Sequence, residues 1–169
     1  MQAQRGDEEA FGRLMNLFDR KLLYYLMRFT PDPDQALDIA QEVWLSVFRG
    51  LRKLRNPGVF RAWLYQIAHA RVVSQVRKNV REEQILERFS TGREHHPECE
   101  APISNDPELV HHALAALSPE HREVLVLRFL EDMSLEEMAQ ALQCRLGTVK
   151  SRLHYAKLAL KQQIDTHHE

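Results

Sequence analysis

A run of positive side chains near the C-terminus has the composition expected of a surface that binds nucleic-acid phosphates. Between Gln143 and Ile164 the sequence contains five Lys or Arg residues and no Asp or Glu. A helix that faces only solvent normally mixes both signs of charge, whereas Lys and Arg neutralise phosphates and donate hydrogen bonds to base edges. The chemistry predicted here is reversible recognition of duplex DNA, in which no covalent bond changes.

A helix-turn-helix is the element predicted to position this basic run. Ser118 and Pro119 suit the start of one helix, because a Ser side chain caps the first turn and Pro lacks an amide hydrogen that this turn leaves unpaired. Ser134 and Glu137 have the capping-box spacing at the start of a short second helix. The residues predicted to face inward are Val124, Leu125, Leu127, Phe129 and Leu130 in the first helix, and Leu135, Met138, Ala139 and Leu142 in the second.

The last helix is predicted from Gly147 to about Ile164, after a tight turn at residues 143–145. At 100° per residue one stripe of this helix is apolar, so the opposite face and its flanks can enter a groove of DNA. The apolar stripe consists of Val149, Leu153, Ala156 and Leu160. The candidate DNA-binding residues are Arg145, Thr148, Lys150, Ser151, Arg152, His154, Tyr155 and Lys157.

Three further helices are predicted upstream, separated by proline-containing turns. They are expected over about Asp7 to Phe29, over Pro33–Arg49, and from Pro57 to about Val80. In the middle helix the stripe expected to be buried consists of Ala36, Ile39, Ala40, Val43 and Val47. The opposite stripe consists of Asp38, Gln41, Glu42, Leu45 and Arg49. A leucine in a polar stripe favours contact with a protein partner, and a solvated face with an incidental leucine stays an alternative.

The third of these helices lies in a strongly basic segment. Residues 49–81 contain nine Lys or Arg and no Asp or Glu, and Phe60, Trp63 and Tyr65 occur among them. Aromatic rings stack on unpaired bases and cations neutralise phosphates, so this combination suits single-stranded DNA. We expect Trp63 and Ile67 to be largely buried. The candidate residues for the unpaired strand, expected to be exposed, are Arg61, His69, Arg71, Arg77 and Lys78.

An acidic segment follows and is predicted to be a flexible linker. Between Glu82 and Leu109 there are eight Asp or Glu and two Lys or Arg, together with several turn-forming Pro and Gly residues. His95, His96 and Cys99 lie in this segment and raise the question of a zinc site. Structural zinc usually requires four ligands with paired spacing, so neither a metal nor another cofactor is predicted.

The overall composition favours two small helical domains over a single large core. The chain has 169 residues, of which 44% are hydrophobic, and it contains only six Gly and seven Pro. Neither a run of about 18 apolar residues nor a signal-peptide core occurs, so we expect a cytoplasmic protein without membrane insertion. The sequence also has neither a phosphate-binding glycine loop nor a nucleophile-and-base motif, so it is not predicted to be an enzyme.

Three segments resemble one protein family. Residues 117–160, with Gly-Thr-Val-Lys-Ser-Arg-Leu at 147–153, resemble region 4 of bacterial RNA polymerase sigma factors of the extracytoplasmic-function (ECF) class. Residues 36–48 and 60–68 resemble two helices of region 2. The resemblance implies an all-α protein with a three-helix region 2 at 1–81, the linker at 82–107 and a helix-turn-helix region 4 at 108–169.

The resemblance also implies a function, namely promoter-specific initiation of transcription by core RNA polymerase. Asp38, Gln41, Glu42 and Leu45 would lie at or near the β′ clamp helices, and region 4 would meet the β flap. The basic last helix would bind the −35 element, and Arg61, His69, Arg71, Arg77 and Lys78 the melted −10 element. Ala70 and Ser74 stand where the family commonly has Asn and Asp, so the details of −10 readout do not carry over. Whether an anti-sigma factor binds stays open.

Two other classes of protein remain to be distinguished from a sigma factor. A helix-turn-helix regulator that acts without polymerase would explain residues 117–160, but it leaves the stripe on the 33–49 helix without a role. Copurification with core polymerase separates these two hypotheses. An enzyme with a histidine-rich metal site is the third, and metal analysis of linker His and Cys variants tests it.

Overall fold

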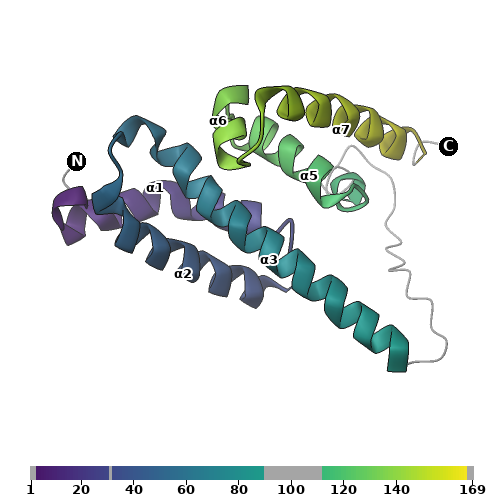
Figure 1. Cartoon of the computed structure of the whole chain (residues 1–169), viewed down its shortest axis with the longest axis horizontal. Helices are drawn as coiled ribbons and strands as arrows, with labels where there is room; N and C mark the ends of the chain where they lie inside the picture. The colour runs from purple at the N-terminus through teal and green to yellow at the C-terminus, as the bar shows by residue number, and fades with distance from the viewer. Residues whose placement is uncertain (1–2, 31, 90–111, 167–169) are drawn as a thin grey trace.

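A computed structural model describes residues 3–30, 32–89 and 112–166, and their regular structure is entirely helical (Figure 1). The N-terminal helices are α1 (Glu8–Leu26), α2 (Pro33–Gly50) and α3 (Phe60–Phe89). The C-terminal helices are α5 (Pro119–Leu125), α6 (Leu135–Ala141) and α7 (Leu146–Thr166). Short 3-10 turns occur at Ala3–Arg5, Leu51–Lys53 and Pro57–Val59, and a π-helical turn, η4, spans Val126–Leu130. The predicted all-α architecture is confirmed.

Side-chain caps set where the N-terminal helices begin. The Asp7 carboxylate accepts a hydrogen bond from the Ala10 amide at 3.0 Å, and Asp32 caps α2 in the same way with Pro33 at its first position. The predicted stripe of α2 is buried as expected, and Trp44 is buried beside it. Trp63 and Ile67, expected to be largely buried, are only partly so.

Helix α3 continues to Phe89 and does not end near Val80 as predicted. Residues 81–89 contain neither Gly nor Pro and are rich in Glu, Arg, Gln and Leu, which are good helix formers, so their acidic charge does not interrupt the helix. The helix therefore includes the first part of the segment predicted as a linker. The remainder of that segment, 90–107, lies outside the described residues.

The C-terminal helices form the predicted helix-turn-helix. Ser118 caps α5, and Ser134 and Glu137 form the capping box of α6, with hydrogen bonds of 3.1 and 2.8 Å. Between α6 and α7 the backbone turns at Gln143, whose φ of 50° lies in the left-handed region.

Phe129 and Leu130 do not face inward as predicted, and their exposed fractions are 58% and 41%. Both lie in the π-helical turn η4. A π turn contains an extra residue relative to an α turn, so it rotates the following side chains away from the face that a 3.6-residue period predicts. These two apolar side chains are therefore available on the surface.

The two groups of helices pack against each other through α3 and α6 (Figure 1). Their buried apolar residues form one continuous cluster, which includes Tyr25 and Leu64 from the first group and Val124 and Met138 from the second. Polar contacts between the groups accompany this cluster and involve residues that the sequence assigned to DNA binding.

Candidate nucleic-acid interfaces

Helix α7 carries a polar, basic face opposite a buried apolar stripe. Val149, Leu153 and Ala156 are buried and Leu160 is partly buried, as the sequence predicted. All eight candidate DNA-binding residues lie on α7 or in the turn before it. The exposed members are Arg145, Lys150, Ser151, His154, Tyr155 and Lys157, and Thr148 and Arg152 are partly buried.

Local hydrogen bonds organise the first turn of α7. The Thr148 and Val149 amides donate to the Arg145 carbonyl at 2.9 and 3.1 Å, and the Ser151 hydroxyl donates to the Thr148 carbonyl at 3.0 Å. The Lys157 ammonium lies 5.5 Å from the centre of the Phe129 ring, a cation–π distance that positions its charge beside the helix. A helix of this diameter fits the major groove of B-DNA, where N-terminal residues of a recognition helix meet base edges.

The candidate protein-binding face of α2 is exposed, as predicted. Asp38, Gln41, Glu42 and Leu45 all face solvent, and Leu45 is 54% exposed. Gln41 and Leu45 border a groove of about 590 Å³ between α1 and α2. Its other lining residues are Phe11, Met15, Asp19, Leu37, Ala40, Trp44 and Phe48.

Sequence reasoning missed two members of this face. Leu37 and Phe48 are 46% and 56% exposed, and they extend the apolar surface at both ends of the groove. Phe48 packs edge-on against Phe11 with ring centres 5.2 Å apart, and the Trp44 indole donates to the Asp19 carboxylate at 2.8 Å. Leu37 is four positions before Gln41, and Phe48 is three positions after Leu45. Residues at these spacings lie on the same side of a helix, so the spacing could have identified both from the sequence. A contiguous exposed apolar face of this kind indicates a protein partner.

The candidate strand-binding residues on α3 fall into two sets. Arg71, Arg77 and Lys78 are exposed, as predicted, and Arg71 pairs with Glu42 at 3.4 Å. Arg61 and His69 are not exposed, which corrects the expectation from sequence. Both side chains contact the C-terminal helices, because α6 and α5 pack over this part of α3 and place carboxylates against them.

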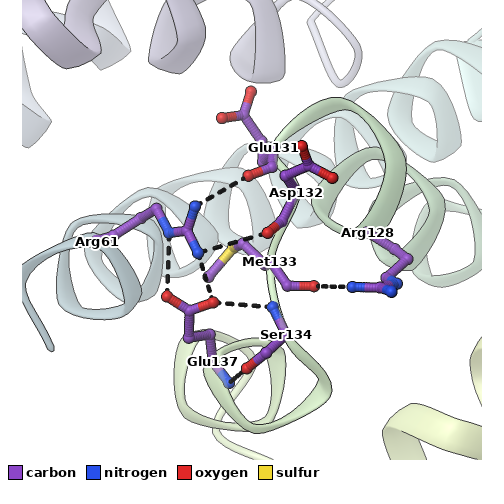
Figure 2. A network of polar contacts seen from close by, with 7 residues as sticks. All are labelled: Arg61, Arg128, Glu131, Asp132, Met133, Ser134 and Glu137. Atoms are coloured by element: carbon purple, nitrogen blue, oxygen red, sulfur yellow. Dashed lines mark hydrogen bonds and ion pairs between the residues drawn. The ribbon is translucent and has the colours of Figure 1, made fainter.

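Figure 2 shows how Arg61 is surrounded. Its Nε and Nη2 donate to the two oxygens of the Glu137 carboxylate at 3.1 and 2.5 Å. Its Nη1 donates to the Glu131 carbonyl at 3.3 Å and its Nη2 to the Asp132 carbonyl at 3.5 Å. Burial raises the pKa of Glu137, but the hydrogen bonds from Arg61 and Ser134 outweigh it and hold that pKa below its usual range.

His69 and Tyr25 share a second carboxylate from the C-terminal helices. The Glu123 side chain is buried, its Oε1 lies 2.8 Å from His69 Nδ1, and it accepts a hydrogen bond from the Tyr25 hydroxyl. Burial, with the nearby Glu123 charge, raises the pKa of Tyr25, so the phenol remains a donor. The side chains of Tyr25, His69 and Glu123 therefore form hydrogen bonds that join the N-terminal helices to the C-terminal helices.

A third carboxylate, that of Glu131, is buried beside Tyr65 and points away from Arg61 (Figure 2). Burial raises its pKa, while Tyr65, Lys21 and Arg61 act in the opposite direction. Burial also raises the pKa of Tyr65, as does the Glu131 charge. The cost of burying the Glu131 carboxylate is therefore only partly compensated by these neighbours, at the contact between the N-terminal and C-terminal helices.

The candidate metal ligands His95, His96 and Cys99 lie outside the described residues. Among the residues that are described, no three His, Cys, Asp or Glu side chains lie close enough together to hold a metal. Cys144 is partly buried in the turn before α7, and burial raises the pKa of its thiol. Within the same residues, no helix is both long and apolar enough to cross a bilayer.

Comparison with protein-family models gives two matches in the order that the sequence predicted. Sigma-70 region 2 matches residues 14–82, and Sigma-70, region 4 matches residues 108–160.

Relatives with known roles match over most of the chain. RNA polymerase sigma-H factor of Pseudomonas aeruginosa is 32% identical, over 93% of this chain and 87% of that protein. RNA polymerase sigma factor YlaC of Bacillus subtilis is 30% identical over 88% of each. The ECF RNA polymerase sigma-E factor of Escherichia coli is 28% identical over 95% and 90%.

Two solved structures share the fold. The sigma factor RpoE of Bartonella quintana, in complex with the anti-sigma factor NepR, has a TM-score of 0.75 at 24% identity, over 93% of this chain and 98% of that one. CnrH, in complex with the cytosolic domain of CnrY, has a TM-score of 0.72 at 23% identity, over 98% and 94%. The family matches and the relatives favour a polymerase-dependent role over a regulator that acts alone. The chain belongs to the ECF class of bacterial RNA polymerase sigma factors.

Proposed function

We propose that this sigma factor divides initiation among three surfaces carried by different helices. The α2 face binds core polymerase, α7 binds the −35 duplex, and the basic side of α3 holds the −10 strand. The observation that carries the proposal is that one exposed apolar face and two basic faces lie on three different helices of one small chain, with the α2 and α3 surfaces adjoining at the ion pair between Glu42 and Arg71.

The proposed −35 surface is the exposed face of α7. Arg145, Lys150 and Lys157 are exposed cations, and the helix carries no acidic residue before Asp165 to repel phosphates. Ser151, His154 and Tyr155 supply polar groups between these charges, and Thr148 and Arg152 lie at the edges of the same face. Cations at the flanks suit phosphate contacts, whereas the polar side chains between them suit base edges.

The proposed polymerase surface is the α2 face formed by Asp38, Gln41, Glu42 and Leu45, with Leu37 and Phe48 as an apolar extension. It combines exposed leucines with carboxylates, so a partner helix with apolar and basic residues would complement it. The β′ clamp helices are the proposed partner. Region 4 would contact the β flap, and the exposed Phe129 and Leu130 offer it an apolar surface.

The proposed −10 surface consists of Arg61, His69, Arg71, Arg77 and Lys78. Arg71, Arg77 and Lys78 are exposed in this structure, so they support the proposal directly. Arg61 and His69 would join them only when the C-terminal helices move away from α3.

Three further properties complete the proposal. The protein works in the cytoplasm, it acts by binding and does not itself catalyse a reaction, and its partners include an anti-sigma factor. The last point is supported by the solved structure of similar fold in which the sigma factor RpoE is in complex with the anti-sigma factor NepR.

Mapping of transcripts tests the proposed function. Core polymerase is mixed with this chain and a genomic DNA library, and the 5′ ends of the products are sequenced. We expect starts at a fixed distance from a shared pair of promoter elements, which disappear with core polymerase alone. Transcripts that start at the same positions with and without the chain would refute the proposal.

A further inference from the structure

A short turn near the N-terminus contacts the basic loop that precedes α3. We propose that Gln4, in the 3-10 turn Ala3–Arg5, is a positioning residue that orders residues 51–56 for contact with the −10 strand. The inference rests on the proposed −10 role of the basic segment 49–81. It extends the −10 surface from α3 to the loop before it, and it gives a role to a residue outside that segment.

The loop at residues 51–56 presents positive charge to solvent. Arg52, Lys53 and Arg55 are all exposed, and residues 49–81 contain no Asp or Glu. Exposed cations of this kind can each neutralise a phosphate of a bound strand. A loop that is already ordered loses less conformational entropy when it binds, so its conformation affects the affinity for the strand directly.

Gln4 binds two carbonyl groups of this loop. Its Nε2 donates to the Leu54 carbonyl at 2.6 Å and to the Leu51 carbonyl at 3.3 Å. The Leu51 side chain is buried and that of Leu54 is partly buried, so these two residues anchor the loop. Gln4 is 47 and 50 positions away from its two partners. The N-terminal turn therefore adds a connection that the residues of the loop do not supply themselves.

The backbone beside Gln4 has a conformation that supports this contact. Gly6 has a φ of 91°, in the left-handed region that favours glycine, and its amide donates to the Ala3 carbonyl at 3.2 Å. A Cβ atom at residue 6 would lie 2.8 Å from Arg52 Nη2. Gly6 therefore closes the turn that carries Gln4 and also leaves room for the guanidinium of a loop cation.

The test compares Gln4→Met with two other full-length variants. Met has nearly the length of Gln but no amide, so this change removes both hydrogen bonds without adding charge. Gln140→Met makes the same chemical change at an exposed position of α6 and is the matched control. A loop-neutral variant replaces Arg52, Lys53 and Arg55 with Gln and retains Gln4. Thermal unfolding and competition for core polymerase establish that each variant is folded and forms holoenzyme.

The first measurement is hydrogen exchange of the Leu54 amide in the free chain, because this amide donates to the Leu51 carbonyl at 3.1 Å within the loop. Loss of two hydrogen bonds should raise the fraction of open loop by about fivefold to a hundredfold, and exchange should accelerate by the same factor. The Gln140→Met control should exchange as the wild type does. Unaltered exchange in the Gln4→Met chain would overturn the inference.

The second measurement is binding of the holoenzyme to a labelled, unpaired −10 strand, taken from a promoter that the transcript mapping identifies. Gln4→Met should weaken this binding by up to the same factor, because the apparent affinity scales with the fraction of ordered loop. The slope of log K against log salt concentration should fall in magnitude by about 0.7 for each phosphate contact that is lost. An unchanged slope would overturn the inference, since a purely structural role for Gln4 predicts it.

The loop-neutral variant shows whether Gln4 acts through the loop. We expect it to bind the strand more weakly than the wild type, and we expect Gln4→Met to add little further loss in this background. Wild-type affinity of the loop-neutral variant would overturn the inference, as would a full additional loss from Gln4→Met. Failure of the proposed function is distinguishable, because it appears as missing promoter-specific transcripts with the wild-type chain. The exchange measurement requires neither polymerase nor a promoter.

Discussion

Replacing Leu45 with Arg tests whether the exposed face of α2 binds core polymerase. Leu45 is 54% exposed, so its replacement removes little apolar burial in the free chain, and a surface substitution of this kind changes stability by about 0.5 kcal/mol or less. In the complex, burial of the exposed part of Leu45 contributes about half of the roughly 1.5 to 3 kcal/mol that full burial of a Leu side chain gives, and a buried Arg adds a desolvation cost. We therefore expect binding to weaken by about 2 to 4 kcal/mol, or about 30-fold to 1,000-fold in Kd.

The assay is competition with a labelled wild-type chain for core polymerase, alongside thermal unfolding of each variant. Leu17→Arg is the matched control, because Leu17 is a leucine on α1 with 68% exposure that lines a different groove. It should bind polymerase as the wild type does. Adding Asp38→Arg to Leu45→Arg should abolish detectable binding with helical content and thermal midpoint nearly unchanged. Wild-type affinity of the Leu45→Arg chain would show that this face does not bind polymerase.

Three further predictions concern the other surfaces. We expect replacement of Lys150 or Lys157 with alanine to weaken the salt dependence of binding to −35 duplexes. In titrations, the slope of log K against log salt concentration should fall in magnitude by about 0.9 for each phosphate that is no longer neutralised. An unaltered slope would contradict binding of phosphate by that lysine. Alanine at Arg61, Arg71, Arg77 and Lys78 together should leave polymerase binding intact but block promoter opening, and a template premelted across the −10 element should partly restore transcription; full activity on a closed promoter would refute the melting role. Glu131→Gln should raise the thermal midpoint at neutral pH, because burial raises the pKa of Glu131 and the ionised form therefore destabilises the fold. The gain should shrink as pH falls through the raised pKa, because both side chains are then neutral; a gain that is constant with pH would point to another cause.

Local chemistry in the sequence determined most of the helices and their starting points. Asp7, Asp32, Ser118 and Ser134 are caps in the structure, because capping depends on a side chain and amides only two or three residues away. The stripes of α2 and α7 were also predictable, since a 3.6-residue period alone distinguishes the buried side from the exposed side. The family followed from residues 147–153 and the segments upstream.

Other features depended on the tertiary structure, because the regular 3.6-residue period of a helix does not predict them. The exposure of Phe129 and Leu130 depends on a π turn, which changes the helical phase within a few residues. The groove beside Leu45 includes Phe11 and Met15 from α1, so its shape depends on how two helices pack.

The pairing of Arg61 with Glu137 is the clearest example of a contact that depends on the tertiary structure. The two residues are 76 positions apart, and in its own segment Glu137 is recognisable only as a capping-box residue and Arg61 only as an exposed cation. Periodicity shows which side of a helix is polar, but it does not show which other helix will cover that side. The sequence alone therefore determined the basic character of α3, and only the packing of α6 against it decided that Arg61 meets a carboxylate in this structure.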